Sequence, residues 1–366
     1  MWTIHPRGES RVEEQNLSLP IDTSGDVTSL CWHVGSQSSS SDYQPNEPFL
    51  AAGTFGGLTM IWNVDGTLRA NLPSPHGPVF SMRFNPSGTI FVTCSASGVF
   101  EIYDTKTWAS IFKVPAAGRI WDCPGTIPCL AWLDDRRLAI LGPDAPQGIV
   151  NCWQFDETHA TSPFLRLIGH EEPINDIQYD KQSGFLATAS DDHTVRLWKP
   201  DRSTPYREFR NHTGPVRAVA FQPTSEDTPT RILASASYDG SICFYDIITF
   251  KHLHSIGHQL HSFPNDRISC LSWSPDGKYL CTGDLEGVVG IWEWRDALPP
   301  GPFAIWAPDR IQEDQHDQLT NGTNGHKEDG ERPVYSIQWQ KNGQSFVVCR
   351  ENRKVFCPLS SVRTKV

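Results

Sequence analysis

The chain has 366 residues, of which 38% are hydrophobic, with 28 glycines and 28 prolines. This length and composition suffice for one large β domain. The formal net charge of −11 argues against nucleic-acid binding over the whole surface. No apolar run approaches the roughly 18–20 residues that a membrane span needs, and the first residues lack the apolar core of a secretory signal.

A pattern of three short β-like runs recurs along the chain. Its clearest copy opens at Gly169-His170 and continues through 174–179, 185–190 and 195–198. The first run ends in an aromatic at Trp32, Phe84, Trp132, Tyr179, Phe221, Trp273 and Trp339. The third run carries its own aromatic at Trp62, Tyr103, Trp153, Trp198, Tyr245, Trp292 and Phe356.

A period of roughly 40–50 residues with a Gly-His opening and a Trp-Asp-like close is typical of a WD40 β-propeller. A single four-stranded unit cannot bury both of its faces, so units must stack to make a core. The sequence therefore predicts an all-β WD40 propeller, with seven blades closed by the N-terminal strand. The ten cysteines form no CxxC pair and are expected to be small buried hydrophobes in a reducing compartment.

Each unit is expected to hold a buried hydrogen-bonded tetrad of histidine, hydroxyl, aspartate and aromatic. Removing one member would leave its buried partners without hydrogen bonds, which costs roughly 1–3 kcal/mol of stability for each group. Such a tetrad would therefore keep its blade rigid. The predicted members are His170, Ser190, Asp192 and Trp198 in the clearest copy, and His212, Ser237, Asp239 and Tyr245 in the next. Two copies depart from the pattern, with Glu286 and Gly56 at the position of the aspartate.

The unit boundaries predict four segments. Residues 1–23 form an N-terminal segment or closing strand, and residues 24–308 hold units one to six. Residues 309–332 are acidic and rich in Asn and Gly, which predicts a disordered insertion. Residues 333–366 hold the last unit and the C-terminal tail.

Five sequence segments within the repeats indicate a particular family of WD40 proteins. They are 26–32 (DVTSLCW), 61–68 (IWNVDGTL), 76–85 (HGPVFSMRFN), 231–240 (RILASASYDG) and 333–339 (PVYSIQW). Their order resembles the propeller of the transducin-β-like corepressor subunits over about residues 24–359. The resemblance implies a nuclear WD40 subunit of a histone-deacetylase complex, with corepressor subunits and histone tails as partners.

The chain departs from that family at its N-terminus. Members usually carry a LisH oligomerisation module and an eighth unit before the Asp-Val-Thr-Ser-Leu phrase, and neither is visible here. Residues 1–4 resemble the end of a third strand. Residues 11–20 then either belong to a missing blade or complete the blade of 333–359, which we favour because an open ring exposes sheet edges. Without the module, the oligomeric state stays open.

No pattern predicts catalysis. The chain has no G-x-S-x-G, phosphate-binding glycine loop or HExxH, and the tetrad hydroxyl lacks an oxyanion hole. The cluster of His252, His254, His258 and His261 is expected in a turn between units, with His258 or His261 as a tetrad histidine. We therefore expect no enzyme activity, cofactor or metal.

A partner-binding face is predicted at the start of each first strand and at the turn before each tetrad acid. These positions are Phe55, Phe80, Asn175, Asp191, Arg217, Tyr238, Leu285 and Tyr335. Aromatics and arginine are enriched in interface hot spots, although the same side chains could simply plug the central channel. Asp191 and the overall acidity favour a Lys/Arg-bearing tail, such as a histone tail.

Two functions remain open. One is a nuclear corepressor scaffold. The other is a WD40 adaptor elsewhere, in the nucleus or cytoplasm, such as a ubiquitin-ligase substrate receptor or an RNA-processing subunit. In both cases we expect protein partners, without sequence-specific nucleic acid, membrane or small-molecule substrate.

The polar stretch 309–332 has no β pattern and is expected to contribute little to packing. Limited proteolysis should cut there first. Deleting Gln312–Asp329 should leave the melting temperature close to that of the parent. A deletion variant that unfolds would show that the unit boundaries are misplaced.

Overall fold

The computed structural model describes the greater part of the chain. The described residues are 27–33, 49–63, 67–74, 76–114, 130–141, 148–155, 163–224, 231–257, 267–295, 298–306, 333–339, 343, 345–350, 353–358 and 363–364. Within these ranges every regular element is a β-strand. They hold no helix that could cross a membrane.

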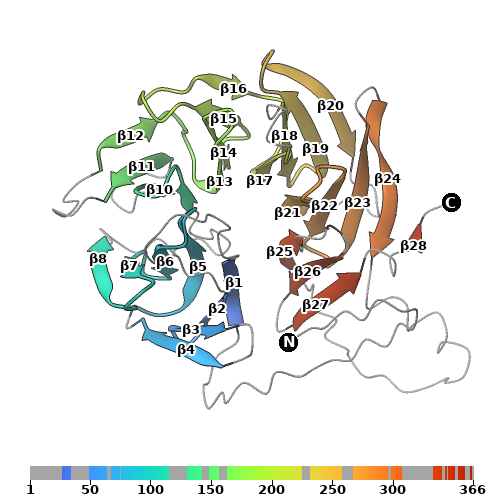
Figure 1. Cartoon of the computed structure of the whole chain (residues 1–366). Coiled ribbons are helices and arrows are strands. Elements are labelled where there is room, and N and C mark those ends of the chain that lie inside the picture. Colours follow the sequence, from blue (N-terminus) through green and yellow to red (C-terminus); the bar gives the residue numbers. More distant parts are fainter. Residues whose placement is uncertain are drawn as a thin grey trace, which may run out of the picture. The chain divides into compact units, whose positions relative to one another are not determined.

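The chain divides into two compact units, and the first comprises Met1–Ala145 and Asn151–Phe164. Two four-stranded antiparallel sheets lie wholly within this unit (Figure 1). The first holds β1 (Val27–His33), β2 (Phe49–Thr54), β3 (Leu58–Asn63) and β4 (Leu68–Pro73). The second holds β5 (Val79–Phe84), β6 (Ile90–Ser95), β7 (Phe100–Asp104) and β8 (Ser110–Val114). The unit also holds β9 (Leu130–Trp132), β10 (Arg137–Leu141) and most of β11 (Ile149–Gln154).

The second unit comprises Pro146–Val150 and Leu165–Val366, and begins its strands with β12 (Leu165–Ile168). One sheet holds β13 (Ile174–Asp180), β14 (Phe185–Ser190), β15 (Val195–Trp198) and β16 (Arg207–Phe209). The next holds β17 (Val216–Phe221), β18 (Ile232–Ser237), β19 (Ser241–Asp246) and β20 (Lys251–Gly257).

Two further sheets follow in the second unit. The first holds β21 (Ile268–Trp273), β22 (Tyr279–Asp284), β23 (Val289–Arg295) and β24 (Leu298–Trp306), with β28 (Arg363–Thr364) added beside β24. The other holds β25 (Val334–Trp339), β26 (Ser345–Arg350) and β27 (Arg353–Pro358). With the sheet made of β9–β12, the described residues hold seven sheets in all.

The two aromatic series mark the first and third strands of these sheets. Every predicted first-run aromatic, from Trp32 to Trp339, lies in the first strand of its sheet. Every predicted third-run aromatic, from Trp62 to Phe356, lies in the third strand. The apolar periodicity therefore located the strands correctly.

Six of the first strands carry one extra residue near their start. In the pairing of β13 with β14, Ile174 faces Ser190 and Asp176 faces Ala189, so Asn175 is the extra residue of β13. The same register shift occurs in β1, β5, β17, β21 and β25. Such bulges bend a strand and redirect the unpaired side chain.

The apolar core lies between neighbouring sheets of a unit. Leu197 and Phe209 of one sheet pack with Val219 of the next in a single buried cluster. First-strand tryptophans also tie neighbouring sheets by hydrogen bonds: Trp273 Nε1 donates to the Ala220 carbonyl over 3.2 Å, and Trp339 Nε1 to the Ser272 carbonyl over 3.0 Å. The indole suits these two positions because it combines a large apolar area with an N–H donor.

Some predictions fall outside the described residues. These include the closing strand at residues 1–23 and the insertion at 309–332. The seven-blade ring with N-terminal closure therefore stays a prediction.

Glycine at position 283 reflects close packing between β22 and β25. A Cβ there would lie 2.5 Å from Val334 Cγ1 and 2.9 Å from Cys270 Sγ. The equivalent residues of β14 and β18 are Ala189 and Ala236.

Gly283→Ala should therefore lower the free energy of unfolding by about 1–3 kcal/mol, the usual cost of overpacking a core. Denaturant titration measures this directly. In a Val334→Ala background the opposing methyls are gone, and the same change should cost less. An equal cost in both backgrounds would contradict the assigned contact.

Candidate functional site

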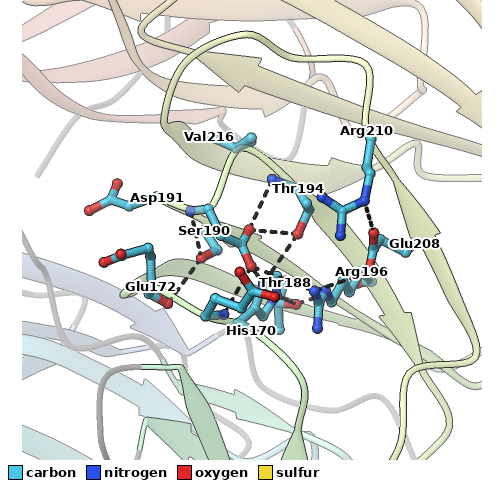
Figure 2. A network of polar contacts seen from close by, with 12 residues as sticks. His170, Glu172, Thr188, Ser190, Asp191, Thr194, Arg196, Glu208, Arg210 and Val216 are labelled. Carbon is cyan, nitrogen blue, oxygen red and sulfur yellow. Dashed lines mark hydrogen bonds and ion pairs between the residues drawn. The ribbon is translucent and has the colours of Figure 1, made fainter.

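A buried polar network joins the strands of the β13–β16 sheet (Figure 2). His170 bonds Asp192 Oδ2 through Nδ1 over 2.8 Å and Thr188 Oγ1 through Nε2 over 2.7 Å. Trp198 Nε1 donates to the same Thr188 oxygen over 2.9 Å. Thr194 Oγ1 donates to Asp192 Oδ1, so both carboxylate oxygens are engaged.

The hydroxyl of this network corrects the sequence prediction, which chose Ser190. Ser190 Oγ instead donates to the Glu172 carbonyl over 3.1 Å and accepts from the Asp192 backbone N–H. Ser190 therefore fixes the turn that carries Asp192. Thr188, two residues earlier on the same face of β14, links the imidazole to the indole.

The β17–β20 sheet repeats this arrangement. His212 bonds Asp239 Oδ2 through Nδ1 over 3.2 Å and Ser235 Oγ through Nε2 over 2.7 Å. Ser235 Oγ lies 3.5 Å from the Tyr245 hydroxyl. The predicted Ser237 is wrong for the same reason as Ser190, because Ser237 Oγ donates to the Gly214 carbonyl.

The β21–β24 sheet retains half of the network. Trp292 Nε1 donates to Thr282 Oγ1 over 2.9 Å, as in the first copy. Asp284 replaces the turn serine and accepts from the backbone N–H groups of Glu286 and Val288. The predicted histidines His258 and His261 lie outside the described residues.

The pKa values of the two network histidines shift in opposite directions. Burial lowers the pKa of His170, and the nearby positive charge of Arg196 opposes the raising effect of Asp192. Burial also acts on His212, but its hydrogen bonds to Asp239 and Cys243 outweigh that effect and raise its pKa to about 9. These shifts favour the imidazolium form of His212 beside Asp239 and the neutral form of His170.

Four of the predicted face residues form one connected group in the second unit. Asn175 Nδ2 donates to Asp191 Oδ1 over 2.7 Å and to the Val216 carbonyl over 2.9 Å. Arg217 Nη1 donates to Asn175 Oδ1 over 2.7 Å and lies 3.5 Å from Asp191 Oδ1. The Arg217 guanidinium carbon lies 4.9 Å from the centroid of the Tyr238 ring.

Arg267 joins the same group, although the sequence did not point to it. Its guanidinium carbon lies 6.0 Å from the Tyr238 ring centroid, and its carbonyl accepts from the Leu285 N–H. The residue precedes β21 in a connecting segment, where no strand pattern marks it. We call the six residues the arginine–tyrosine face: Asn175, Asp191, Arg217, Tyr238, Arg267 and Leu285.

The bulges explain why this face assembles. Asn175 and Arg217 are the extra residues at the bulges of β13 and β17, where a bulge redirects the side chain. Asp191 and Tyr238 begin the turns after β14 and β18, where their N–H groups donate to the Pro173 and Pro215 carbonyls. Equivalent positions in consecutive sheets are thereby brought into contact.

The remaining predicted positions are less informative. Phe55 follows β2 in the first unit and is 60% exposed. Phe80 and Tyr335 occupy the bulges of β5 and β25, but their side chains lie outside the described part of the structure. It therefore stays a prediction that all eight residues lie on one partner-binding face.

No metal-ligating cluster of three or more His, Cys, Asp or Glu side chains occurs among the described residues. His252 bonds Ser255 Oγ over 2.8 Å, and His254 lies in the same strand, β20. Absence of a cofactor or metal remains an expectation of the sequence.

Comparison with known proteins agrees with this architecture. Residues 66–104, 161–199, 203–246 and 251–293 match the family described as WD domain, G-beta repeat. WD repeat-containing protein 1 of Gallus gallus is 28% identical over 251 residues, covering 66% of this chain and 37% of that protein. SIR4-interacting protein SIF2 of Saccharomyces cerevisiae is 24% identical over 235 residues, covering 62% and 39% respectively.

A solved structure shows the same fold. The crystal structure of the C-terminal WD40 domain of Sif2 matches with a TM-score of 0.64 and 18% identity, over 84% of this chain and 76% of that chain. The chain thus has the all-β WD40 propeller fold. It spans less than two fifths of the length of the two curated relatives.

The raised pKa of His212 predicts a pH-dependent stability. A histidine with a pKa of about 9 when folded and 6.5 when unfolded contributes stability that is fully present below pH 6.5. That contribution is lost as the pH rises through about 9. Asp239→Asn should therefore lower the free energy of unfolding by about 1–3 kcal/mol near pH 6, as measured by chemical denaturation. This loss should become smaller towards alkaline pH.

Asp192→Asn is the matched control, because the pKa of its partner His170 is lowered. The loss of unfolding free energy caused by Asp192→Asn should stay constant over the same pH range. If the two variants show parallel profiles, His212 is not charged in the folded protein.

Proposed function

We propose that this WD40-repeat protein is a non-enzymatic interaction scaffold that binds a partner polypeptide on its arginine–tyrosine face. The observation that carries the proposal is the contact of Asn175, Asp191 and Arg217 with one another and of Arg217 with Tyr238. Scattered surface residues would not be ordered in this way by hydrogen bonds that span two sheets.

The physical properties of the face suit binding. The Arg217 side chain is 13% exposed, so its conformation is fixed before a partner arrives. Tyrosine and arginine bury a large area, and a fixed conformation reduces the entropy lost on association. Tyr238 is half-buried, and its ring lies near two guanidinium groups, those of Arg217 and of the exposed Arg267.

The geometry also indicates which side chains a partner segment should present. Asp191 already accepts hydrogen bonds from Asn175 and lies against Arg217, so it is not a free anionic pocket. A lysine of a histone tail would have to displace Arg217 from this carboxylate. We therefore propose that Tyr238 and Leu285 make the main contacts, and that a basic tail binds less well than a segment with apolar side chains.

We further propose that the scaffold belongs to a nuclear corepressor assembly with histone-deacetylase activity. The support is the resemblance of five repeat phrases to the transducin-β-like subunits, together with the similarity to a SIR4-interacting protein. Affinity purification of the tagged chain should then co-elute deacetylase activity. Recovery of ubiquitin-ligase or RNA-processing subunits instead would assign the chain to the alternative adaptor class.

Tyr238→Ala should weaken binding of the purified partner by about thirtyfold, as expected for a central hot-spot residue worth roughly 2 kcal/mol. Calorimetry or surface plasmon resonance measures the change. The melting temperature should shift little, because the Tyr238 ring lies outside the buried core.

Ile168→Ala supplies a control, since Ile168 is an apolar side chain of the same unit that is 53% exposed and lies away from these contacts. It should bind like the parent. Equal affinity for Tyr238→Ala and the parent would move the binding site to another surface.

A further inference from the structure

Three aromatic rings of the second unit meet at a second place on its surface. The Phe185 and Tyr206 centroids are 5.1 Å apart, those of Tyr206 and Phe250 are 5.4 Å apart, and those of Phe185 and Phe250 are 5.9 Å apart. Phe185 begins β14, Tyr206 precedes β16 and Phe250 precedes β20. Three segments of two neighbouring sheets therefore build this cluster.

Three cationic side chains lie over these rings. Lys199 Nζ is 5.3 Å from the Phe185 centroid and 5.2 Å from that of Tyr206. The Arg202 guanidinium carbon is 5.5 Å from the Tyr206 centroid. The Arg207 guanidinium carbon is 5.0 Å from the Phe250 centroid and 6.0 Å from that of Tyr206. We call the six residues the basic–aromatic patch.

The three cations have no anionic partner within the described residues. No carboxylate of that part of the chain lies within ion-pair distance of Lys199, Arg202 or Arg207. Glu208, the acidic neighbour of Arg207, is already paired with Arg196 and Arg210. The exposed Asp201 lies between Lys199 and Arg202 in the sequence but is within ion-pair distance of neither, so three cations gather here in a chain of net charge −11.

The rings hold these cations near one another and leave them donors for a ligand. A guanidinium has five N–H donors, so attraction to a ring leaves donors for carboxylate oxygens. Arg202 and Arg207 are both exposed, so a partner can reach those donors. The rings also restrict the long side chains, which lowers the entropic cost of binding.

The backbone at Phe250 is strained to build the patch. Phe250 has φ +57°, which is uncommon for a residue with a side chain. Trp108 adopts φ +56° at the equivalent turn of the first unit, where it packs on Phe49 and Phe91. There one cation, Arg69, lies over a ring, and that ring belongs to the fully buried Phe49. The strained aromatic is therefore shared by both turns, whereas the group of three cations, with Arg202 and Arg207 exposed and Lys199 half-buried, is found among the described residues at the patch.

We propose that the basic–aromatic patch is a second interaction surface, which binds an acidic segment of a partner polypeptide. Carboxylates would bond the outer edges of Arg202 and Arg207 and the ammonium of Lys199. Exposed Ile248, in the turn that leads to Phe250, offers apolar contact at the margin. The patch is independent of the arginine–tyrosine face, and either can fail without the other.

An acidic polypeptide fits this patch better than a nucleic acid. Nucleic-acid affinity depends on neutralising many phosphates, about 6–10 in a typical complex, and the patch offers three cations. The surrounding net negative charge would repel the rest of a long polyanion. A short acidic segment avoids that repulsion.

The test is fluorescence anisotropy with the full chain and a labelled peptide of alternating glutamate and aspartate. Arg202→Gln combined with Arg207→Gln should weaken peptide binding by about tenfold or more, and high ionic strength should weaken binding to the parent. Arg166→Gln combined with Lys278→Gln removes the same charge from exposed positions elsewhere in the unit, and should bind like the parent. Melting temperatures of both variants confirm that each is folded.

A second variant covers the case in which the glutamines unfold the patch. Arg202→Lys combined with Arg207→Lys keeps the charge but loses the paired donors, and should show intermediate binding. Equal weakening by the patch variant and the control variant would overturn the proposal. So would binding of labelled oligouridine by the parent in preference to the acidic peptide, which would make the patch a nucleic-acid surface.

Discussion

The extra residue near the start of the first strands β13 and β17 is the constraint on which the candidate face depends. Without the bulge, Asn175 and Arg217 would take their places in the ladder of paired residues and alternate regularly with their neighbours. With it, both side chains reach across to the neighbouring sheet, where Asn175 binds the Val216 carbonyl and Arg217 binds Asn175. One backbone irregularity, repeated from sheet to sheet, thus converts a stack of sheets into an ordered surface.

The buried tetrads supply the rigidity that the surface requires. In each complete copy a histidine ties the turn acid to the hydroxyl of the second strand, so the turn that carries Asp191 or Tyr238 is held against the sheet. The pKa shifts of the two histidines differ in direction because Arg196 lies beside Asp192, whereas Cys243 lies beside His212. In both copies each ring nitrogen of the histidine has a hydrogen-bond partner.

The sequence predicted the strands and part of the face, because both depend on periodic residues. Aromatics recurring at one position per unit located every first and third strand, and equivalent turn positions identified Asn175, Asp191, Arg217 and Tyr238. The tetrad hydroxyl was misplaced by two residues because positions 188 and 190 project from the same face of β14, and only pairing distances separate them. Arg267 and the basic–aromatic patch could not be found, because long side chains from irregular segments meet there without any periodic signal.

The central claim is that Asn175 and Arg217 couple neighbouring sheets into one preorganised face. A double-mutant cycle on the free energy of unfolding, with Asn175→Ala, Arg217→Ala and the double variant, tests it most directly. The contact geometry predicts a coupling energy of about 1 kcal/mol or more, since each residue loses its 2.7 Å partner in either single variant. Additivity within about 0.3–0.5 kcal/mol would contradict the claim and show that the two side chains act independently.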